Sequence, residues 1–469
     1  MIRIGKISLY RVNLRTRMPF RYGIAVLTEL PHLFLEMEAE VDGVICQGIA
    51  ADHLPPKWFT KDPLRDPKEE IDDMLTVIRH AATLGKGTEG ESVFAIWRDL
   101  YERQALWGRE QGWPPLLCQF GTSLVERALI DAFCRRHQKP FHRLLHENAF
   151  GINLGNMHED LADSAPSDWL PSEPLTEVFC RHTVGLSDAI FEKEIPSDEK
   201  LTDGLPQSLE ACVAHYGVRQ LKIKITSNSE ESIARLRKIF SLIESCKFVS
   251  SFSLDGNESF SDVGQFQQFW STLNSDLKLN SALKNLLFVE QPFSRAIALS
   301  PEVKNDMLAW KERPPIIIDE SDAEISSLRH ALDVGYIGIS HKNCKGVFRG
   351  IANACLLAKK RRDSNSPFLM SGEDLANIGP VALLQDLAVQ AALGNKSVER
   401  NGHHYFAGLS SSSPSIQKQM LECHSDLYTA SPHGWPTVRI ENGMIQLASV
   451  NAAPFGSAFF PQEDSREQV

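Results

Sequence analysis

The sequence has no apolar run long enough to cross a membrane, and its first residues enter a strand-like alternation without an apolar signal segment. It also has no Cys-x-x-Cys pair, although nine cysteines are scattered along its 469 residues. These absences exclude a regular disulfide framework and predict a cytoplasmic protein with reduced, mostly buried thiols. No Gly-x-Gly-x-x-Gly motif follows the first predicted strand, which argues against a dinucleotide-binding dehydrogenase.

Positive charge is scarcer than negative charge. The formal net charge of −11 at pH 7 argues against a polyanionic partner, so we expect neither nucleic acid binding nor membrane association. A hydrophobic fraction of 42% and a charged fraction of 23% are typical of a globular enzyme. A chain of 469 residues exceeds what one small core organises, so we expect two domains, or one barrel with added elements.

The front of the chain, residues 1–150, is predicted to form a separate α+β domain. Apolar and polar residues alternate between positions 33 and 41, and the Asp42-Gly43 pair that follows suits the tight turn of an antiparallel hairpin. From about Pro67 to Leu145 the spacing of apolar residues becomes helical.

Residues 151–425 show short β-rich runs that alternate with helical segments. This alternation favours parallel strands joined by helices, and eight runs is the number that a closed barrel needs. We therefore predict the fold class α/β, a (β/α)7β TIM-like barrel with an α+β capping domain. Residues 426–469 are β-like again, and we expect this C-terminal segment to return to the cap. The expected strands are 178–185, 220–226, 248–255, 286–290, 316–319, 336–341, 368–371 and 404–408.

Three acidic residues each stand at the C-terminal end of a predicted strand: Asp255, Glu290 and Asp319. Their spacing is about that of one βα unit, so the three carboxylates should converge on the rim where such barrels place active sites. A single acid at this position is more often an ordinary loop residue. Three converging carboxylates, however, repel one another unless a cation joins them, and an all-oxygen set suits Mg²⁺.

Lysines flank this triplet. Lys222 and Lys224 are two residues apart on one strand and therefore face the same side. On a half-exposed strand such a pair is simply a solvated face, but helices cover the outside of a barrel, so these lysines should point to its mouth. Lys342 ends the sixth predicted strand, which lies opposite the second. Two amines on either side of a metal permit proton transfer at two faces of one carbon, and a cation stabilises the enediolate formed when a proton α to a carboxylate is removed.

As an ordered set, these motifs resemble the mandelate racemase and muconate lactonizing enzyme branch of the enolase superfamily, in which a lysine or histidine base works beside Mg²⁺. The front domain resembles that family's capping domain, with residues 19–22 in the position of its substrate-covering loop and the segment after Gly48 in that of a second loop. The motifs that carry the resemblance are Lys222-Ile223-Lys224, Leu254-Asp255-Gly256-Asn257, Val289-Glu290-Gln291-Pro292, Ile318-Asp319-Glu320-Ser321 and His341-Lys342-Asn343-Cys344-Lys345-Gly346.

The resemblance implies that Asp255, Glu290 and Asp319 bind Mg²⁺, and that Lys224 and Lys342 are acid/base catalysts on opposite faces of the substrate. The lysine on the sixth strand is similar to the muconate lactonizing type of site. The mandelate racemase type would instead place an aspartate there and a histidine on the seventh strand.

Further residues are expected around this core. Lys222 would help to hold the substrate carboxylate, and Arg21 and Glu373 are candidates for other substrate contacts, although Glu373 also suits the start of a helix. Asn257 and Glu320 would support the metal ligands from behind. We expect His341 to point away from the barrel interior.

The most specific function that these residues indicate is a racemase or epimerase acting on a small-molecule carboxylate. The same site would also serve a β-elimination (lyase) or a cycloisomerisation, and a catalytically silent barrel acting as a binding protein is an alternative of another class. Similar dipeptide epimerases carry an Asp-x-Asp pair after the eighth strand, and the residues expected there, 403–408, lack it. We further expect a homo-oligomer.

Overall fold

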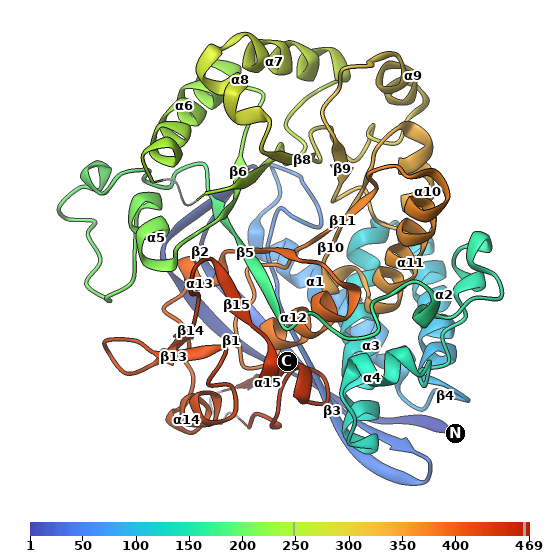
Figure 1. Cartoon of the computed structure of the whole chain (residues 1–469). Coiled ribbons are helices and arrows are strands. Elements are labelled where there is room, and N and C mark those ends of the chain that lie inside the picture. The colour runs from blue at the N-terminus through green and yellow to red at the C-terminus, as the bar shows by residue number, and fades with distance from the viewer. Residues whose placement is uncertain (247–248, 463–465) are drawn as a thin grey trace.

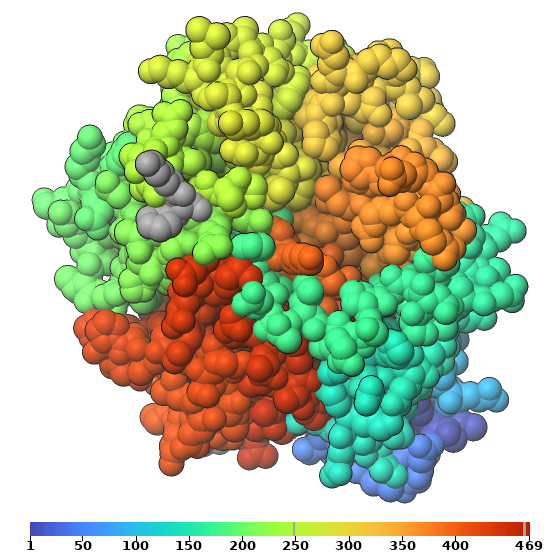
Figure 2. Space-filling model, viewed as in Figure 1, coloured from blue at the N-terminus to red at the C-terminus, as the bar shows by residue number. Residues whose placement is uncertain are grey.

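The computed structural model describes residues 1–246, 249–462 and 466–469 of the chain. An antiparallel sheet with its helices forms one part, and a parallel barrel forms the other (Figure 1). In the view of Figure 2 the barrel segments, from green to red, cover most of the surface, and the blue N-terminal residues of the cap emerge at the lower right edge. Among the described residues, no helix combines the length and the apolarity needed to cross a membrane.

The cap is built on three long antiparallel strands, β1 (Ile2–Tyr22), β2 (Ala25–Val41) and β3 (Val44–His53). Asp42 and Gly43 have φ angles of 51° and 77°, as expected for the tight turn between β2 and β3. The helices that follow are α1 (Pro67–Gly85), α2 (Val93–Gln111), α3 (Pro115–His137) and α4 (Phe141–His146), and the short β4 (Glu89–Gly90) pairs with β1.

Helix α3 is the centre of the cap and is buried along most of its length. Its backbone approaches β3 so closely that a Cβ atom at Gly48 would collide with the carbonyl oxygen of Ala128. Only glycine fits at this position, so the sheet and the helix form one packed unit.

Within the described residues, eight parallel strands close into a barrel, because β12 pairs with β5. Helices lie outside the strands, as the spacing of apolar residues predicted (Figure 1). The strands are β5 (Glu177–Val184), β6 (Gln220–Lys224), β7 (Ser251–Asp255), β8 (Leu286–Glu290), β9 (Ile316–Ile318), β10 (Gly338–His341), β11 (Leu369–Gly372) and β12 (Ser397–Arg400). The helices are α5 (Leu209–Tyr216), α6 (Ser229–Cys246), α7 (Val263–Ser275), α8 (Leu277–Leu283), α9 (Pro301–Ala309), α10 (Ser327–Val334), α11 (Val347–Ser364), α12 (Ala382–Leu393), α13 (Gly402–Tyr405), α14 (Pro414–Cys423) and α15 (Ala448–Ala452).

The eighth strand differs from the sequence prediction. The expected strand at 404–408 is wrong: β12 ends at Arg400, and helix α13 begins at Gly402. Because the inward-facing Glu399 is polar, β12 contains only one apolar residue, Val398, and lacks the pattern that reveals a buried strand. The expected strand at 248–255 is present as β7, but its first residue, Phe248, lies outside the described residues.

The C-terminal segment contacts both parts of the molecule. After a hairpin of β13 (Tyr428–Ala430) and β14 (Pro436–Val438), strand β15 (Met444–Gln446) pairs with the first three residues of β5. The last strand, β16 (Glu467–Gln468), pairs with β1 of the cap. The two parts are therefore joined by the end of the chain as well as by the connection between them.

Candidate active site

Lysines and acids meet at the C-terminal ends of adjacent barrel strands. In the register of the sheet, Lys224 at the end of β6 pairs with Asp255 at the end of β7, and Asp255 pairs with Glu290 at the end of β8. Asp319 follows β9, and Lys342 follows β10. Because parallel strands end at one rim, residues far apart in the sequence are brought to a single site.

Three carboxylates form a compact group. Glu290, Asp319 and Glu373 each offer an oxygen, and these atoms lie within 4.8 Å of one another. Asp255, which the sequence predicted as a metal ligand, stands beside this group. Its Oδ2 is 2.6 Å from Nζ of Lys224, and its Oδ1 accepts a hydrogen bond from the backbone N–H of Asn257 at 2.8 Å.

Lys222 links the acids. Its Nζ lies 2.8 Å from carboxylate oxygens of Glu290, Glu373 and Glu399, and 3.1 Å from Oδ2 of Asp255. Burial alone would lower the pKa of Lys222, but the four carboxylates raise it well above its usual value. This lysine is therefore a fixed positive charge at the centre of the site.

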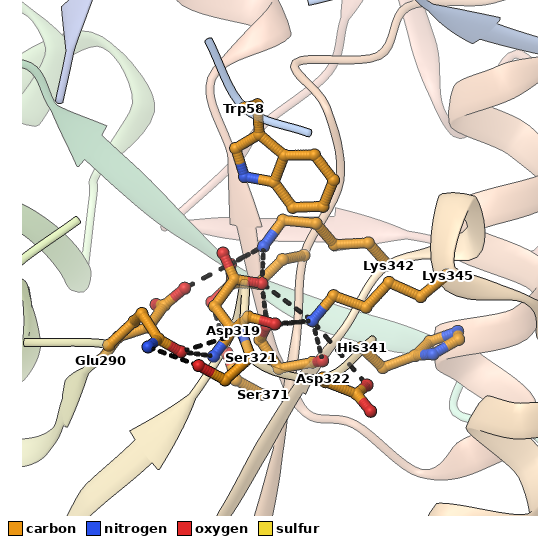
Figure 3. Close-up of polar contacts among 12 residues, drawn as sticks. Trp58, Glu290, Asp319, Ser321, Asp322, His341, Lys342, Lys345 and Ser371 are labelled. Carbon is orange, nitrogen blue, oxygen red and sulfur yellow. Dashed lines mark hydrogen bonds and ion pairs between the residues drawn. The ribbon is translucent and has the colours of Figure 1, made fainter. Parts of the chain in front are cut away.

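Lys342 enters the site after the end of β10, between Trp58 and Asp319 (Figure 3). Its Nζ donates to Oδ1 of Asp319 at 2.6 Å and to Oε2 of Glu373 at 2.7 Å, and it lies 5.4 Å from the ring centroid of Trp58. Burial opposes its charge, but the neighbouring carboxylates, Asp319 first, raise its pKa well above the usual value. Lys345 also contacts Asp319, at 2.9 Å.

The acid group suits a divalent cation. Among the described residues, none donates a hydrogen bond to either carboxylate oxygen of Glu290, although Lys222 and Lys342 form ion pairs with it at 2.8 and 4.0 Å. Burial and then the charge of Glu373 raise the pKa of Glu290 well above its usual value. An acid crowded by other acids is the environment that a bound cation relieves, and an all-oxygen donor set fits Mg²⁺.

A cavity of about 50 Å³ lies over these groups. The cap forms its upper wall, from the β1–β2 hairpin and the segment after β3, which are the two regions that the sequence predicted to cover a substrate. The cap residues in this wall are Phe20, Tyr22, Leu27, Leu30, Pro55 and Trp58. On the barrel side it is lined by Lys222, Lys224, Asp255, Asn257, Asp319, Lys342, Asp374, Leu375, Ala376, Glu399 and Asn401.

Two predicted substrate contacts lie elsewhere. Arg21 is exposed, because the alternation of β1 turns Phe20 and Tyr22 inward and Arg21 outward. Glu373 is buried beneath the cavity, where burial would raise its pKa but Lys222, Lys342 and Arg181 hold it well below its usual value. It contacts the lysines rather than the space that a substrate would occupy.

Asn257 and Glu320, the residues expected to support the metal ligands, take different positions in the site. Asn257 lines the cavity and positions Asp255 through its backbone. Glu320 is buried, and burial followed by the charges of Asp319 and Glu258 raises its pKa to about 7. His341 points away from Lys342 (Figure 3) and lies against Gly350 of α11, outside the barrel interior as predicted. Its Nε2 lies 3.2 Å from Oδ1 of Asn343.

The sequence analysis missed three residues on the strands that close the barrel. Glu399 on β12 pairs with Lys222 and accepts a hydrogen bond from Thr183 of β5 at 2.6 Å. Arg181, also on β5, donates to Oε1 of Glu373 at 3.0 Å. The alternation of β5 could have identified Arg181 and Thr183 as inward-facing residues. Glu399 was missed because the eighth strand was predicted at 404–408 and not at β12.

The fold is shared with solved enzymes of the enolase superfamily. A mandelate racemase/muconate lactonizing protein from Herpetosiphon aurantiacus superposes with a TM-score of 0.60 at 14% identity, covering 96% of this chain and 97% of the other. A dipeptide epimerase from Enterococcus faecalis, complexed with Mg and the dipeptide L-Leu-L-Tyr, gives 0.61 at 15% identity, covering 97% and 99%.

A muconate lactonizing enzyme from Pseudomonas fluorescens, complexed with muconolactone, gives a TM-score of 0.59 at 16% identity and covers 95% of this chain and 94% of its own. No family model and no curated protein sequence matches the chain. At these low identities the likeness shows a barrel with a capping domain, and the chemistry must be argued from the site itself.

Proposed function

We propose that this protein is a Mg²⁺-dependent racemase or epimerase that removes the proton α to a substrate carboxylate through an enediolate intermediate. One observation carries the proposal: Lys224 and Lys342 line the same cavity from strands separated by three others in either direction around the barrel. Two amines placed in this way reach opposite faces of a carbon held between them, which is what 1,1-proton transfer requires.

In this proposal the acids at the ends of the strands hold the cation: Glu290 and Asp319, with Asp255 as predicted or Glu373 from the compact group. Bound Mg²⁺ would stabilise the negative charge of the enediolate and offset the carboxylates that now raise the pKa of Lys342. Lys222 remains a permanent cation, suited to bind the substrate carboxylate.

The two catalytic lysines have separate tasks. In one direction, the neutral amine of Lys224 accepts the α-proton on its Nζ, and the ammonium group of Lys342 donates a proton to the opposite face. In the other direction the roles exchange, so that the protein ends each turnover with one proton moved from one lysine to the other. Asp255 orients Lys224, and Asp319 and Glu373 orient Lys342, through the contacts described above.

The same anion could instead lose a β-substituent or undergo ring opening, so a lyase or a cycloisomerase remains the second candidate. The argument against a dipeptide also changes. The comparison with an Asp-x-Asp pair belongs at the end of β12, where Glu399 and Asn401 both line the cavity, and not at residues 403–408. Dipeptides therefore belong among the substrates to be tested.

The test is α-proton exchange in D₂O. The protein is incubated with Mg²⁺ and sets of hydroxy acids, N-acyl amino acids and dipeptides, and deuterium at the α-carbon is measured by NMR. We expect exchange with at least one set, restricted to one enantiomer in Lys224→Ala and to the other in Lys342→Ala, but kept for both in Lys238→Ala, a matched change of an exposed lysine. Mg²⁺ binding without exchange in any set would contradict the proposal and favour a binding protein.

A further inference from the structure

A second cluster of ligand-type side chains lies outside the barrel interior. While Arg181 and Thr183 of β5 point inward, His182 between them points outward, towards Cys212 of α5 and His404 of α13. All three are buried. None of them takes part in the chemistry proposed above.

The three side chains are close enough to share one ion. Each offers a nitrogen or sulfur atom, and these atoms lie within 4.8 Å of one another. Sγ of Cys212 is 3.4 Å from Nδ1 of His404. In a tetrahedral zinc site, Zn–N and Zn–S bonds of about 2.0 and 2.3 Å place nitrogen and sulfur about 3.5 Å apart. The observed separation therefore needs little adjustment.

Further polar groups lie beside the two imidazoles. Nδ1 of His182 lies 3.1 Å from Nε2 of His403, and Nε2 of His404 lies 3.9 Å from Oδ2 of Asp188. Asp188 is itself fixed, since it accepts hydrogen bonds from Tyr405 at 2.6 Å and from the backbone of Gly185 at 2.7 Å. His404 thus has Nδ1 beside Cys212 and Nε2 towards a fixed carboxylate, an arrangement typical of metal-binding histidines.

The protonation of the histidines agrees with this geometry. Burial lowers the pKa of His182 to about 4 and that of His404 well below its usual value. Both rings are therefore neutral at pH 7, and each keeps a nitrogen lone pair that can bind a metal ion. Burial raises the pKa of the Cys212 thiol. Metal binding would therefore release one proton as the sulfur–hydrogen bond is replaced by a sulfur–metal bond.

We propose that His182, Cys212 and His404 bind one Zn²⁺ ion, with a non-protein ligand in the fourth position. Two imidazoles and a thiolate form a donor set that suits zinc and does not suit Mg²⁺, so this site is chemically distinct from the carboxylate group in the barrel.

The ion would stabilise helix α13, on which the substrate-covering hairpin packs. The ring of Tyr405, next to His404, stacks on Phe20 with 4.1 Å between ring centroids. Nη1 of Arg17, on the same hairpin, donates to the carbonyl oxygen of His404 at 2.7 Å. Zinc would join β5, α5 and α13 directly beneath these contacts, and so fix the base on which Phe20 packs.

The test is the metal content of the protein expressed in medium supplemented with Zn²⁺, because a buried site fills during folding. We expect about one zinc per chain by mass spectrometry, retained during dialysis against Mg²⁺ and lost in Cys212→Ser and His404→Asn. Cys355→Ser is the matched control, because Cys355 is also a buried cysteine on a helix and burial raises its pKa as well. Equal zinc content in Cys212→Ser and wild type would overturn the proposal.

A second readout does not depend on how well a variant folds. Protein grown with Co²⁺ in place of Zn²⁺ should show a sulfur-to-cobalt charge-transfer absorption in the wild type and in Cys355→Ser, because only a thiolate ligand produces it. A cobalt-loaded wild type without this absorption, or a wild type that binds neither metal, would show that Cys212 and His404 form only a hydrogen-bonded pair in the core. Neither readout depends on α-proton exchange, so this proposal can fail while the proposed function stands.

Discussion

Lys224 and Asp255 face each other across neighbouring strands, with Nζ and Oδ2 separated by 2.6 Å. Lys342 has the corresponding relationship to Asp319, also at 2.6 Å. Each amine therefore has a different nearest acid, and the two pairs stand at different sides of one cavity. This arrangement allows the contribution of each lysine to the reaction to be measured separately.

Replacing one lysine should separate the two halves of the reaction. In Lys342→Met, Lys224 still reaches one face of the substrate, so exchange of the α-proton with D₂O should persist for one enantiomer, while racemisation falls by on the order of 10²–10⁴-fold. Lys224→Met should show the same behaviour with the other enantiomer. NMR and polarimetry on each pure enantiomer measure the two rates. Equal loss of exchange for both enantiomers in both variants would argue against the separate tasks.

Removing Lys222 should destabilise the folded protein. Lys222→Met leaves Asp255, Glu290, Glu373 and Glu399 without their common cation, and loss of one partner from a buried ion pair costs about 3–5 kcal/mol. Urea denaturation measures the change in the free energy of unfolding. Mg²⁺ should restore part of the loss, whereas Lys396→Met, at an exposed lysine, should change stability little in either condition.

Mg²⁺ should stabilise the wild type. A ligand that binds only the folded state contributes about 2.7 kcal/mol at one hundred times its Kd. We expect a rise in Tm with Mg²⁺ in the wild type and in Asp363→Asn, an exposed acid outside the site, and no rise in Glu290→Gln. A Glu290→Gln protein that responds like the wild type would place the cation elsewhere.

Glu126 should make stability depend on pH. Its buried carboxylate accepts hydrogen bonds from the backbone of Val347 and Phe348, yet burial raises its pKa from 4.5 to about 7. Between these values the folded state keeps a proton that the unfolded state has lost, so the free energy of unfolding falls as pH rises.

The size of this effect is on the order of 3 kcal/mol between pH 4.5 and 7. Denaturant titrations at several pH values should give a steeper decline in the wild type than in Glu126→Gln, which carries no titrating group at this position. Parallel pH profiles for the two proteins would mean that Glu126 keeps an ordinary pKa.

Much of the barrel could be predicted because its strands are short apolar runs that end in charged residues. Ile316–Ile318 followed by Asp319 is such a run, and it was found at the predicted place. Strand β12 could not be found in this way, because its inward residue Glu399 is polar and its identity as a strand depends on pairing with β5. Pairing between segments so far apart in the sequence leaves no local pattern.

The candidate site, too, could be predicted only in part from the sequence. Strand order and alternation predicted that Lys224 and Lys342 lie at one rim of the barrel, and both line the cavity. They did not indicate how closely Glu373 approaches Glu290 and Asp319, because that depends on the length and direction of side chains inside the barrel. Nor did they connect Cys212 with His182 and His404, since these residues meet only after two helices pack on the same strand.

The contact between Gly48 and Ala128 limits how the cap can respond to a substrate. A cavity of about 50 Å³ is far smaller than the several hundred Å³ typical of ligand sites, so the wall must yield when a substrate arrives. The sheet and α3 touch backbone to backbone and cannot separate without breaking the core of the cap. Movement is thus confined to the hairpin tip around Phe20 and to the segment that carries Trp58. Changes in substrate preference during evolution would accordingly accumulate in these two short stretches, while the rest of the cap stays constant.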